Sequence, residues 1–256
     1  PVVWENLMAS FAVILAAAGK SNRFHDPHYK KPFVPLAERA VWLHSAEKFI
    51  NRDDVQQLVV VISADDRESF MSKFGANVAI LGIDVVEGGA TRSESVRNGL
   101  QAVREEMDFV IVHDAARPCL ATVWIDELIS TVEKTGAVTM GIPVVSTLKR
   151  VADGNVQETV ARDQLWESQT PQAFRRQLLV DAFAQPSSED RKVEAATDEA
   201  QLVEWLGHPV TMISGSPLNR KITTKEDLRF AAMALKALPK PKLDGPAHPF
   251  ADDMWR

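Results

Sequence analysis

Four basic side chains lie near the start of the chain, directly after a short apolar run. The stretch AAAGKSNRF covers residues 16–24, and two more cations follow it closely; the four are Lys20, Arg23, Lys30 and Lys31. A buried strand that opens into a cationic loop containing glycine is a plausible place to bind phosphate. A solvated basic loop explains the same residues equally well, so this stretch alone leaves both interpretations open.

The triplet Gly19-Lys20-Ser21 suggests two familiar phosphate motifs, and the sequence excludes both. A P-loop requires a glycine five positions before Gly19, where this chain has Ile14 inside the apolar run. The dinucleotide fingerprint requires two further glycines, where this chain has Ser21 and Phe24. A phosphate loop here would therefore be of another kind.

An aspartate stands where a buried strand is predicted to end. Asp114 belongs to IVHDAARP, residues 111–118. Open α/β sheets bind ligands at the carboxyl ends of their strands, so beside a phosphate site this carboxylate is a candidate Mg²⁺ ligand. Without such a site it would be an ordinary turn or cap residue. His113 is expected to be a packed strand residue, because no second histidine has a matching spacing.

Three more stretches could take part in binding. EGGATRSES, residues 87–95, places two glycines before a helix with the capping box TRSE, where free N–H groups favour an anion or a base carbonyl. LNRKIT, residues 218–223, offers Arg220 and Lys221 near a predicted strand end. In ATDEAQ, residues 196–201, Thr197 is expected to cap a helix that has acids in its first turn. A tight turn, exposed cations and a helix cap explain these stretches equally simply.

The elements that must position these residues alternate along the chain. Short apolar, β-branched runs and helical patterns predict a Rossmann-like α/β fold, a mostly parallel twisted sheet with helices on both faces. The predicted strands are residues 12–17, 58–62, 78–81, 109–112, 137–142 and 210–213. The predicted helices are residues 41–49, 93–107, 123–134 and 198–206, the last stopped by Gly207.

One segment interrupts the alternation. Residues 143–170 hold two strand-like runs around Asp153-Gly154-Asn155, a strong hairpin signal, and the insertion could be a lid or an arm that packs on a second subunit. Residues 239–256 contain several prolines and little apolar periodicity, so we expect them to be extended or disordered. Residues 1–238 are predicted to form a single domain, with the arm inserted at about 143–170.

Charge and cysteine content limit the class of protein. A net charge of −6 argues against a surface devoted to nucleic acid or acidic lipid, which need a broad positive field. The single cysteine, Cys119, excludes an intrachain disulfide and fits a reducing compartment. The first ten residues lack a basic n-region, and the apolar residues 11–18 are too few to span a membrane. We therefore expect a cytoplasmic protein with a small anionic ligand and no nucleic-acid or membrane partner.

Together and in this order, the motifs resemble those of the 2-C-methyl-D-erythritol 4-phosphate cytidylyltransferase family of nucleotidyltransferases. No single piece is specific, but their combination is, and it runs from residue 12 to about 235. Family loops usually have glycine at the position of Ser21 and methionine at that of Phe24, so the phosphate loop departs in detail. The matching stretches are AAAGKSNRF, KKPF, EGGATRSESVRNGL, VHDAARPCL, PVVSTLKR, LWESQTPQAF, ATDEA and NRKITTKEDL.

The resemblance implies an enzyme that moves a cytidylyl group from CTP to the phosphate of methylerythritol phosphate and releases pyrophosphate, in the non-mevalonate isoprenoid pathway. It implies that Arg23, Lys31 and Lys221 are the catalytic cations and that Mg²⁺ is the cofactor, held by Asp114. The implied CTP-binding residues are Ala17, Ala18, Gly19, Gly89, Ala90, Arg92, Ser95, Asp114 and Ala115.

The resemblance also implies an acceptor site that is shared between subunits. In the family some acceptor contacts come from the arm of the partner, so the hairpin is interpreted as a dimerisation arm and the protein as a homodimer. The implied acceptor-binding residues are Thr147, Arg162, Thr170 and Thr197. Two alternatives stay open: a ribitol 5-phosphate cytidylyltransferase, which shares the nucleotide half, and a protein that binds nucleotide without turnover.

Overall fold

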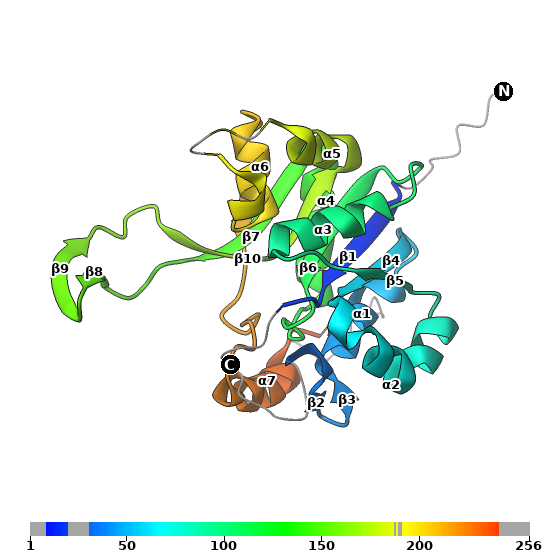
Figure 1. Cartoon of the computed structure of the whole chain (residues 1–256). Coiled ribbons are helices and arrows are strands. Elements are labelled where there is room, and N and C mark those ends of the chain that lie inside the picture. The colour runs from blue at the N-terminus through cyan, green and yellow to red at the C-terminus, as the bar shows by residue number, and fades with distance from the viewer. Residues whose placement is uncertain (1–8, 20–30, 187, 189–190, 241–256) are drawn as a thin grey trace, which may run out of the picture.

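A seven-stranded sheet runs through the centre of the protein in this computed structural model, which describes residues 9–19, 31–186, 188 and 191–240. Its strand order is β11-β7-β10-β6-β1-β4-β5, and four of the six neighbouring pairs are parallel. The strands are β1 (Phe11–Ala16), β4 (Val55–Ile62), β5 (Asp84–Glu87), β6 (Phe109–Asp114), β7 (Ala137–Pro143), β10 (Trp166–Arg175) and β11 (Thr211–Ser214). This is the predicted mostly parallel sheet (Figure 1).

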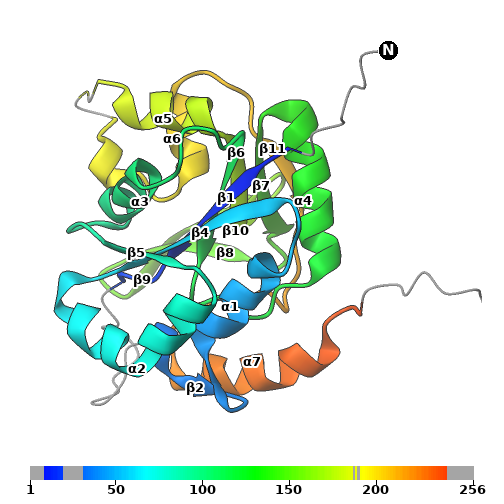
Figure 2. The same ribbon diagram turned by 90° about the vertical axis from the view of Figure 1, so that its right-hand side faces the viewer.

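Helices cover both faces of the sheet (Figure 2), as predicted. Side chains alternate along β1, so Val13 and Leu15 enter one apolar core while Ala12 and Ile14 enter the other. The first core includes residues of α1 (Val41–Ile50), α2 (Arg67–Ile80) and α4 (Thr122–Thr135). The second includes residues of α3 (Arg92–Gln101), α5 (Arg176–Ala184) and α6 (Glu199–Trp205).

A third, smaller apolar cluster lies beside the sheet. It joins α7 (Lys225–Ala237) to the small hairpin of β2 (Pro35–Leu36) and β3 (Arg39–Ala40). Three short 3-10 helices complete the described elements: η1 (Lys31–Phe33), η2 (Ala64–Asp66) and η3 (Val193–Ala195). In the part of the chain that the structure describes, no helix combines the length and apolar character needed to cross a membrane.

The arm projects from the body as a two-stranded ribbon (Figure 1). Its strands are β8 (Leu148–Ala152) and β9 (Asn155–Val160), joined at Asp153 and Gly154. Both turn residues have positive φ, 50° and 77°, which is the backbone that a two-residue hairpin turn requires and that Asp-Gly favours. The predicted hairpin is confirmed, but the arm ends before residue 170. From Trp166 onward the chain is already in β10 and pairs with β7.

Two predictions were wrong, and one strand was missed. Residues 78–81 are not a strand but the end of α2, where Val78 faces the core and Ile80 is 83% exposed. The strand that occupies this edge is β5, whose short, half-exposed sequence gives little apolar signal. The helix predicted over residues 93–107 ends at Gln101. The prediction was too long because Val103 and Met107, which lie in the turns after the helix, pack into the same core as the helix and happen to continue its apolar spacing.

The helix ends follow local side-chain chemistry. The capping box of α3 is confirmed: Glu94 N donates to Thr91 Oγ1 (3.1 Å) and Thr91 N donates to Glu94 Oε2 (3.0 Å). The cap predicted for α6 was placed one residue early, since Asp198 accepts the hydrogen bond from Gln201 N (3.0 Å). Thr197 instead bonds the Gln201 side chain. Gly207, with φ of 80°, follows the end of α6 as predicted.

Candidate active site

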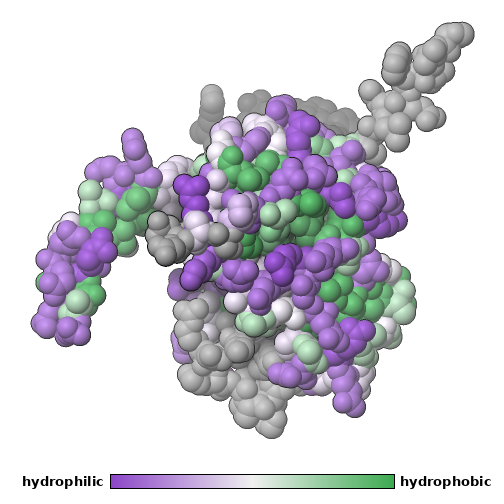
Figure 3. All heavy atoms as spheres, turned by 45° about the horizontal axis from the view of Figure 1, so that its top comes forward, coloured by the Kyte–Doolittle hydropathy of each residue, from purple (hydrophilic) through white to green (hydrophobic). Residues whose placement is uncertain are grey.

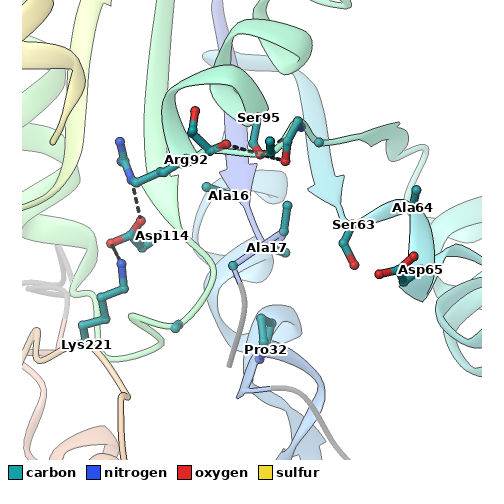
Figure 4. A pocket seen from close by; sticks show the side chains of 17 residues that line it. Ala16, Ala17, Pro32, Ser63, Ala64, Asp65, Arg92, Ser95, Asp114 and Lys221 are labelled. Atoms are coloured by element: carbon teal, nitrogen blue, oxygen red, sulfur yellow. Dashed lines mark hydrogen bonds and ion pairs between the residues drawn. The ribbon is translucent and has the colours of Figure 1, made fainter. Parts of the chain in front are cut away.

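A cavity of about 520 Å³ opens at the carboxyl ends of β1, β4 and β6. This is the edge at which open α/β sheets bind their ligands. Figure 4 shows Asp114, Arg92 and Lys221 on one side of it and Ser63, Ala64 and Asp65 on another. Nine of the residues predicted from the sequence line it: Ala17, Ala18, Gly19, Gly89, Ala90, Arg92, Ser95, Asp114 and Lys221.

The loop before α3 is held in a fixed shape at the cavity wall. Ser95 Oγ donates to Thr91 O (2.8 Å) and accepts from Gly89 N (3.1 Å), so it ties the loop to the first turn of the helix. At Gly88 a Cβ would come within 2.7 Å of the Ala18 Cβ, too close for any other residue unless the two segments move apart. The capping box and these contacts present the N-terminus of α3 to the cavity, where its dipole favours a negative group.

Asp114 is the centre of charge in the site. Its Oδ2 accepts a hydrogen bond from Lys221 Nζ (2.7 Å) and lies 3.5 Å from Arg117 Nε, while its Oδ1 lies 3.5 Å from Arg92 Nε. Burial alone would raise the pKa of Asp114, but the attraction of Lys221, Arg92 and Arg117 outweighs burial and holds that pKa far below its usual value. The carboxylate is therefore ionised at any working pH.

The Asp114 oxygens fit a divalent cation. No cluster of three or more His, Cys, Asp or Glu side chains suited to a metal occurs among the residues that the structure describes. Mg²⁺ does not require one, because it is commonly held by one or two carboxylates together with substrate phosphates and water. Oδ1 has no closer described contact than the 3.5 Å to Arg92 and belongs to a residue that lines the cavity.

Arg92 joins α3 to α6. Its Nη1 and Nη2 donate to Glu199 Oε1 (2.7 Å) and Oε2 (3.0 Å) in a bidentate pair. Burial disfavours the charged form of Arg92, but the attraction of Glu199 and Asp114 outweighs it and raises the Arg92 pKa above its usual value. Burial raises the pKa of Glu199, although Arg92 opposes this.

His113 is linked to the backbone of Asp114 through the hydroxyl of Thr170, and it does not line the cavity. It is fully buried, as predicted, and burial lowers its pKa to about 4, so it is neutral at pH 7. Its Nε2 lies 3.0 Å from Arg117 O, which can only accept, so the proton is on Nε2. Thr170 Oγ1 then donates to Nδ1 (3.1 Å) and accepts from Asp114 N (2.9 Å).

The predicted acceptor residues are not gathered in one place. Thr170 is buried beside Asp114, and Thr197 is exposed just before α6. Thr147 and Arg162 are exposed in the arm, where Arg162 Nη1 donates to Val145 O at the arm's base. None of the four lines the cavity.

Three other predicted residues are not among the described residues that line the cavity. Arg23 lies outside the described residues. For Lys31 only the backbone is described, at the start of η1. Ala115 is fully buried, its N–H donates to Ala16 O and its carbonyl accepts from Ser45, and the neighbouring Ala116 lines the cavity in its stead.

Several site residues were missed by sequence reasoning. Ser63, Ala64 and Asp65 line the cavity after β4, and nothing in VISADD marks them except their place at a strand end. Arg117 and Glu199 were visible within IVHDAARP and ATDEAQ but were interpreted only as parts of a turn and of a helix start. Their roles depend on contacts between distant parts of the chain.

Comparison with known proteins assigns the chain to a family. The model of the IspD family, 2-C-methyl-D-erythritol 4-phosphate cytidylyltransferase, matches residues 11–237. The chain belongs to this family. A relative of that name from Rhodopirellula baltica is 39% identical over 241 residues, which cover 90% of this chain and 96% of the relative. One from Clostridioides difficile is 35% identical over 225 residues, covering 88% and 93%.

Solved structures of this family agree with the fold. The Francisella tularensis 2-C-methyl-D-erythritol 4-phosphate cytidylyltransferase matches with a TM-score of 0.73 and 31% identity, covering 89% of this chain and all of that one. The Thermus thermophilus protein matches with a TM-score of 0.69 and 28% identity, covering 90% and 100%. The resemblance stated from the sequence motifs is thus confirmed at the level of family and fold.

Proposed function

We propose that this protein transfers the cytidylyl group of CTP to the phosphate of 2-C-methyl-D-erythritol 4-phosphate. The relatives that share most of its length carry the name of this activity. The observation that carries the proposal is the convergence of the family's separated motifs on one cavity, where Asp114, Arg92 and Lys221 meet.

The proposed reaction requires neutralisation of the negative charge on the phosphates more than it requires a general base. An oxygen of the acceptor phosphate, already an anion at neutral pH, attacks the α-phosphorus of CTP in line. The bond from that phosphorus to the bridging oxygen breaks, and pyrophosphate leaves with the electron pair. Lys221, already close to Asp114, would stabilise the negative charge that grows at the α-phosphate, and Arg23 and Lys31 would act on the triphosphate.

The nucleotide would bind along the cavity wall. The backbone of residues 17–19 would contact the ribose and base, and the loop of Gly89 and Ala90, with Ser95 and Arg92, would complete the cytosine pocket. Asp114 would hold a Mg²⁺ ion, which when bound neutralises phosphate oxygens. The fixed loop geometry before α3 supports this arrangement, since positioning is a main source of rate in such reactions.

The acceptor would bind between two subunits of a homodimer. Thr170 and Thr197 would contribute from one chain, and Thr147 and Arg162 from the arm of the other, with Arg162 able to grip a phosphate by two hydrogen bonds. A two-stranded ribbon is marginally stable in water alone. Figure 3 shows hydrophobic surface on this arm. Its exposed large apolar side chains, which a partner would cover, are Val145, Val151, Val156 and Leu165, and Trp166 follows them at the start of β10.

A cytoplasmic location is part of the same proposal. Cys119 is buried with a free thiol, and burial raises its pKa to about 11, which keeps the thiol protonated and unreactive. A protein whose one cysteine is unpaired in this way suits a reducing compartment.

An acceptor comparison tests the function. The protein is incubated with CTP and Mg²⁺ and either 2-C-methyl-D-erythritol 4-phosphate or ribitol 5-phosphate, and pyrophosphate release is measured. We expect turnover with the first acceptor. Preference for ribitol 5-phosphate would reassign the acceptor, and CTP binding without pyrophosphate release from either would leave a nucleotide-binding protein without turnover.

A further inference from the structure

Glu199 is a buried carboxylate for which the proposed reaction has no direct use. It is 1% exposed, and its two oxygens meet the two terminal nitrogens of Arg92 at 2.7 and 3.0 Å. Burying an ion pair of this kind adds little net stability, because desolvation of the two charges offsets their attraction. A role in positioning explains it better than a role in holding the fold.

The pair determines how Arg92 lies relative to Asp114. Asp114 has three cations around it, of which Lys221 is in direct contact at 2.7 Å, while Arg92 and Arg117 lie at 3.5 Å. Arg92 Nε donates to Asp114 Oδ1, but at 3.5 Å this hydrogen bond is long. An Arg92 guanidinium without another partner would shorten it, since charge-assisted hydrogen bonds to a carboxylate are usually about 2.7 to 2.9 Å long. Both terminal nitrogens of Arg92 are instead occupied by Glu199, and only its Nε faces Asp114.

We propose that Glu199 is a positioning residue that limits Arg92 to one long hydrogen bond with Asp114 and so leaves the Oδ1 atom of Asp114 available to the cavity. The inference rests on the proposed function in one respect, that Asp114 is the carboxylate which meets the divalent cation and the nucleotide. It adds that α6, whose first residue is Glu199, controls the charge balance of the nucleotide site from the far side of Arg92.

The proposal makes Glu199 and Asp114 competitors for one arginine. Replacing Glu199 by the neutral, similarly shaped Gln weakens its attraction for Arg92. Arg92 is then expected to move closer to Asp114 and to occupy the oxygen that a cation would use. Removing Arg92 as well takes the competing charge away. The second substitution is therefore expected to reverse the effect of the first, which loss of packing would not produce.

The measured quantity is the ratio of CTP dissociation constants without and with Mg²⁺, obtained by calorimetry for the whole protein. For Glu199→Gln this ratio should fall about 10- to 100-fold, the usual effect of losing a residue that orients a metal ligand. For Glu199→Gln with Arg92→Gln both dissociation constants should rise, because Arg92 lines the proposed cytosine pocket, but their ratio should return towards the wild-type value. Glu204→Gln, at an exposed position of the same helix, is the matched control and should leave the ratio unchanged.

Two results would overturn the inference. One is an unchanged ratio in Glu199→Gln; the other is a lowered ratio that Arg92→Gln fails to restore. A rise in the KM for the acceptor with an unchanged CTP ratio would also reject it, because it would mean that Glu199 acts through Thr197 at the start of α6. If Glu199→Gln does not fold, Glu199→Asp keeps the charge but shortens its reach, and a smaller fall in the ratio is then expected.

This test is separate from that of the proposed function. Nucleotide affinity is measured without acceptor, so a wild-type protein that binds CTP with Mg²⁺ but releases no pyrophosphate would reject the activity and still allow the Glu199 comparison. A wild-type protein whose CTP affinity does not depend on Mg²⁺ would reject the inference, whatever its turnover.

Discussion

The cavity and the arm place their polar residues in opposite ways. Asp114 is buried at the end of a central strand, and Lys221 and Arg92 contact it from positions that lie 107 and 22 residues away in the sequence. Arg162 and Thr147 are exposed on a ribbon that leaves the body (Figure 1). The body of one chain therefore arranges the cavity by itself, whereas it does not bring the arm residues to that cavity.

The largest effect is expected from the cavity. Lys221→Ala removes the cation that contacts Asp114 and that is proposed to stabilise the α-phosphate. We therefore expect kcat to fall about 10²- to 10³-fold, as when a hydrogen-bond donor to the transition state is lost. Steady-state pyrophosphate release measures it. Arg220→Ala is the control: its side chain is exposed and pairs with Asp227 at 2.8 Å. Equal losses in the two variants would show that position 221 has no special role.

A substitution in the arm should weaken binding of the acceptor and leave binding of CTP unchanged. Arg162→Ala should raise the KM for the acceptor by roughly 30-fold, corresponding to about 2 kcal/mol for a lost charge-assisted contact. CTP affinity, measured by calorimetry, should not change. Arg150→Ala, which removes another exposed arm arginine paired with Glu158, should change neither quantity. A loss of CTP affinity in Arg162→Ala would place this residue on the nucleotide side.

Mixing two impaired variants, assayed at an acceptor concentration below the KM of Arg162→Ala, tests whether the two regions of one site come from different chains. Subunits that carry Lys221→Ala and subunits that carry Arg162→Ala are combined and allowed to exchange. If the arm contributes to the partner's site, each mixed dimer contains one intact site and one doubly changed site, and pyrophosphate release recovers. Activity that stays at the sum of the two separate variants would assign the arm to its own chain.

The apolar ribbon surface is expected to hold the dimer. Val151 and Val156 are 55% and 60% exposed and are paired across β8 and β9. Changing both to Asp puts charge where a partner would pack, so sedimentation should show monomers while CTP affinity is retained. Lys149→Glu, which changes the charge at an already polar position of the ribbon, should remain dimeric. A dimer that survives the double change would move the interface elsewhere.

The smallest effect compares two equivalent helix caps. Thr91→Ala and Thr224→Ala each remove the side-chain oxygen of a capping box, and each should cost about 1 kcal/mol in the free energy of unfolding. Only Thr91 lines the cavity, so only its loss should also weaken CTP binding, by a few-fold. Denaturation curves and CTP titrations of the two variants measure this. Equal CTP affinities would mean that the loop before α3 is held without its cap.

Local chemistry is what made part of this molecule predictable. The Thr91–Glu94 capping box, the Asp153–Gly154 turn and the strand end at Asp114 each depend on a few adjacent residues, and each was found from the sequence. The family resemblance added further residues of the cavity lining, because the motifs that carry it had already been brought together in known proteins, but it did not add Ser63, Ala64 or Asp65.

Long-range pairing was not predictable in the same way. Glu199 looks like an ordinary first-turn acid, which favours a helix N-terminus wherever it occurs, and its partner Arg92 is 107 positions away. Residues 78–81 look like a strand because four apolar residues in a row fit either element. The metal and the catalytic roles of Arg23 and Lys31 stay predictions, as does the dimer.

The position of β10 also constrains the order in which the sheet can form. β6 and β7 both pair with β10 and not with each other, although they precede it in the chain. In the finished sheet β6 and β7 therefore lie about two strand spacings, or roughly 10 Å, apart, with β10 between them. The two halves of the sheet can therefore join only after Trp166–Arg175 has been made, when β10 pairs antiparallel with both neighbours and brings Thr170 against Asp114.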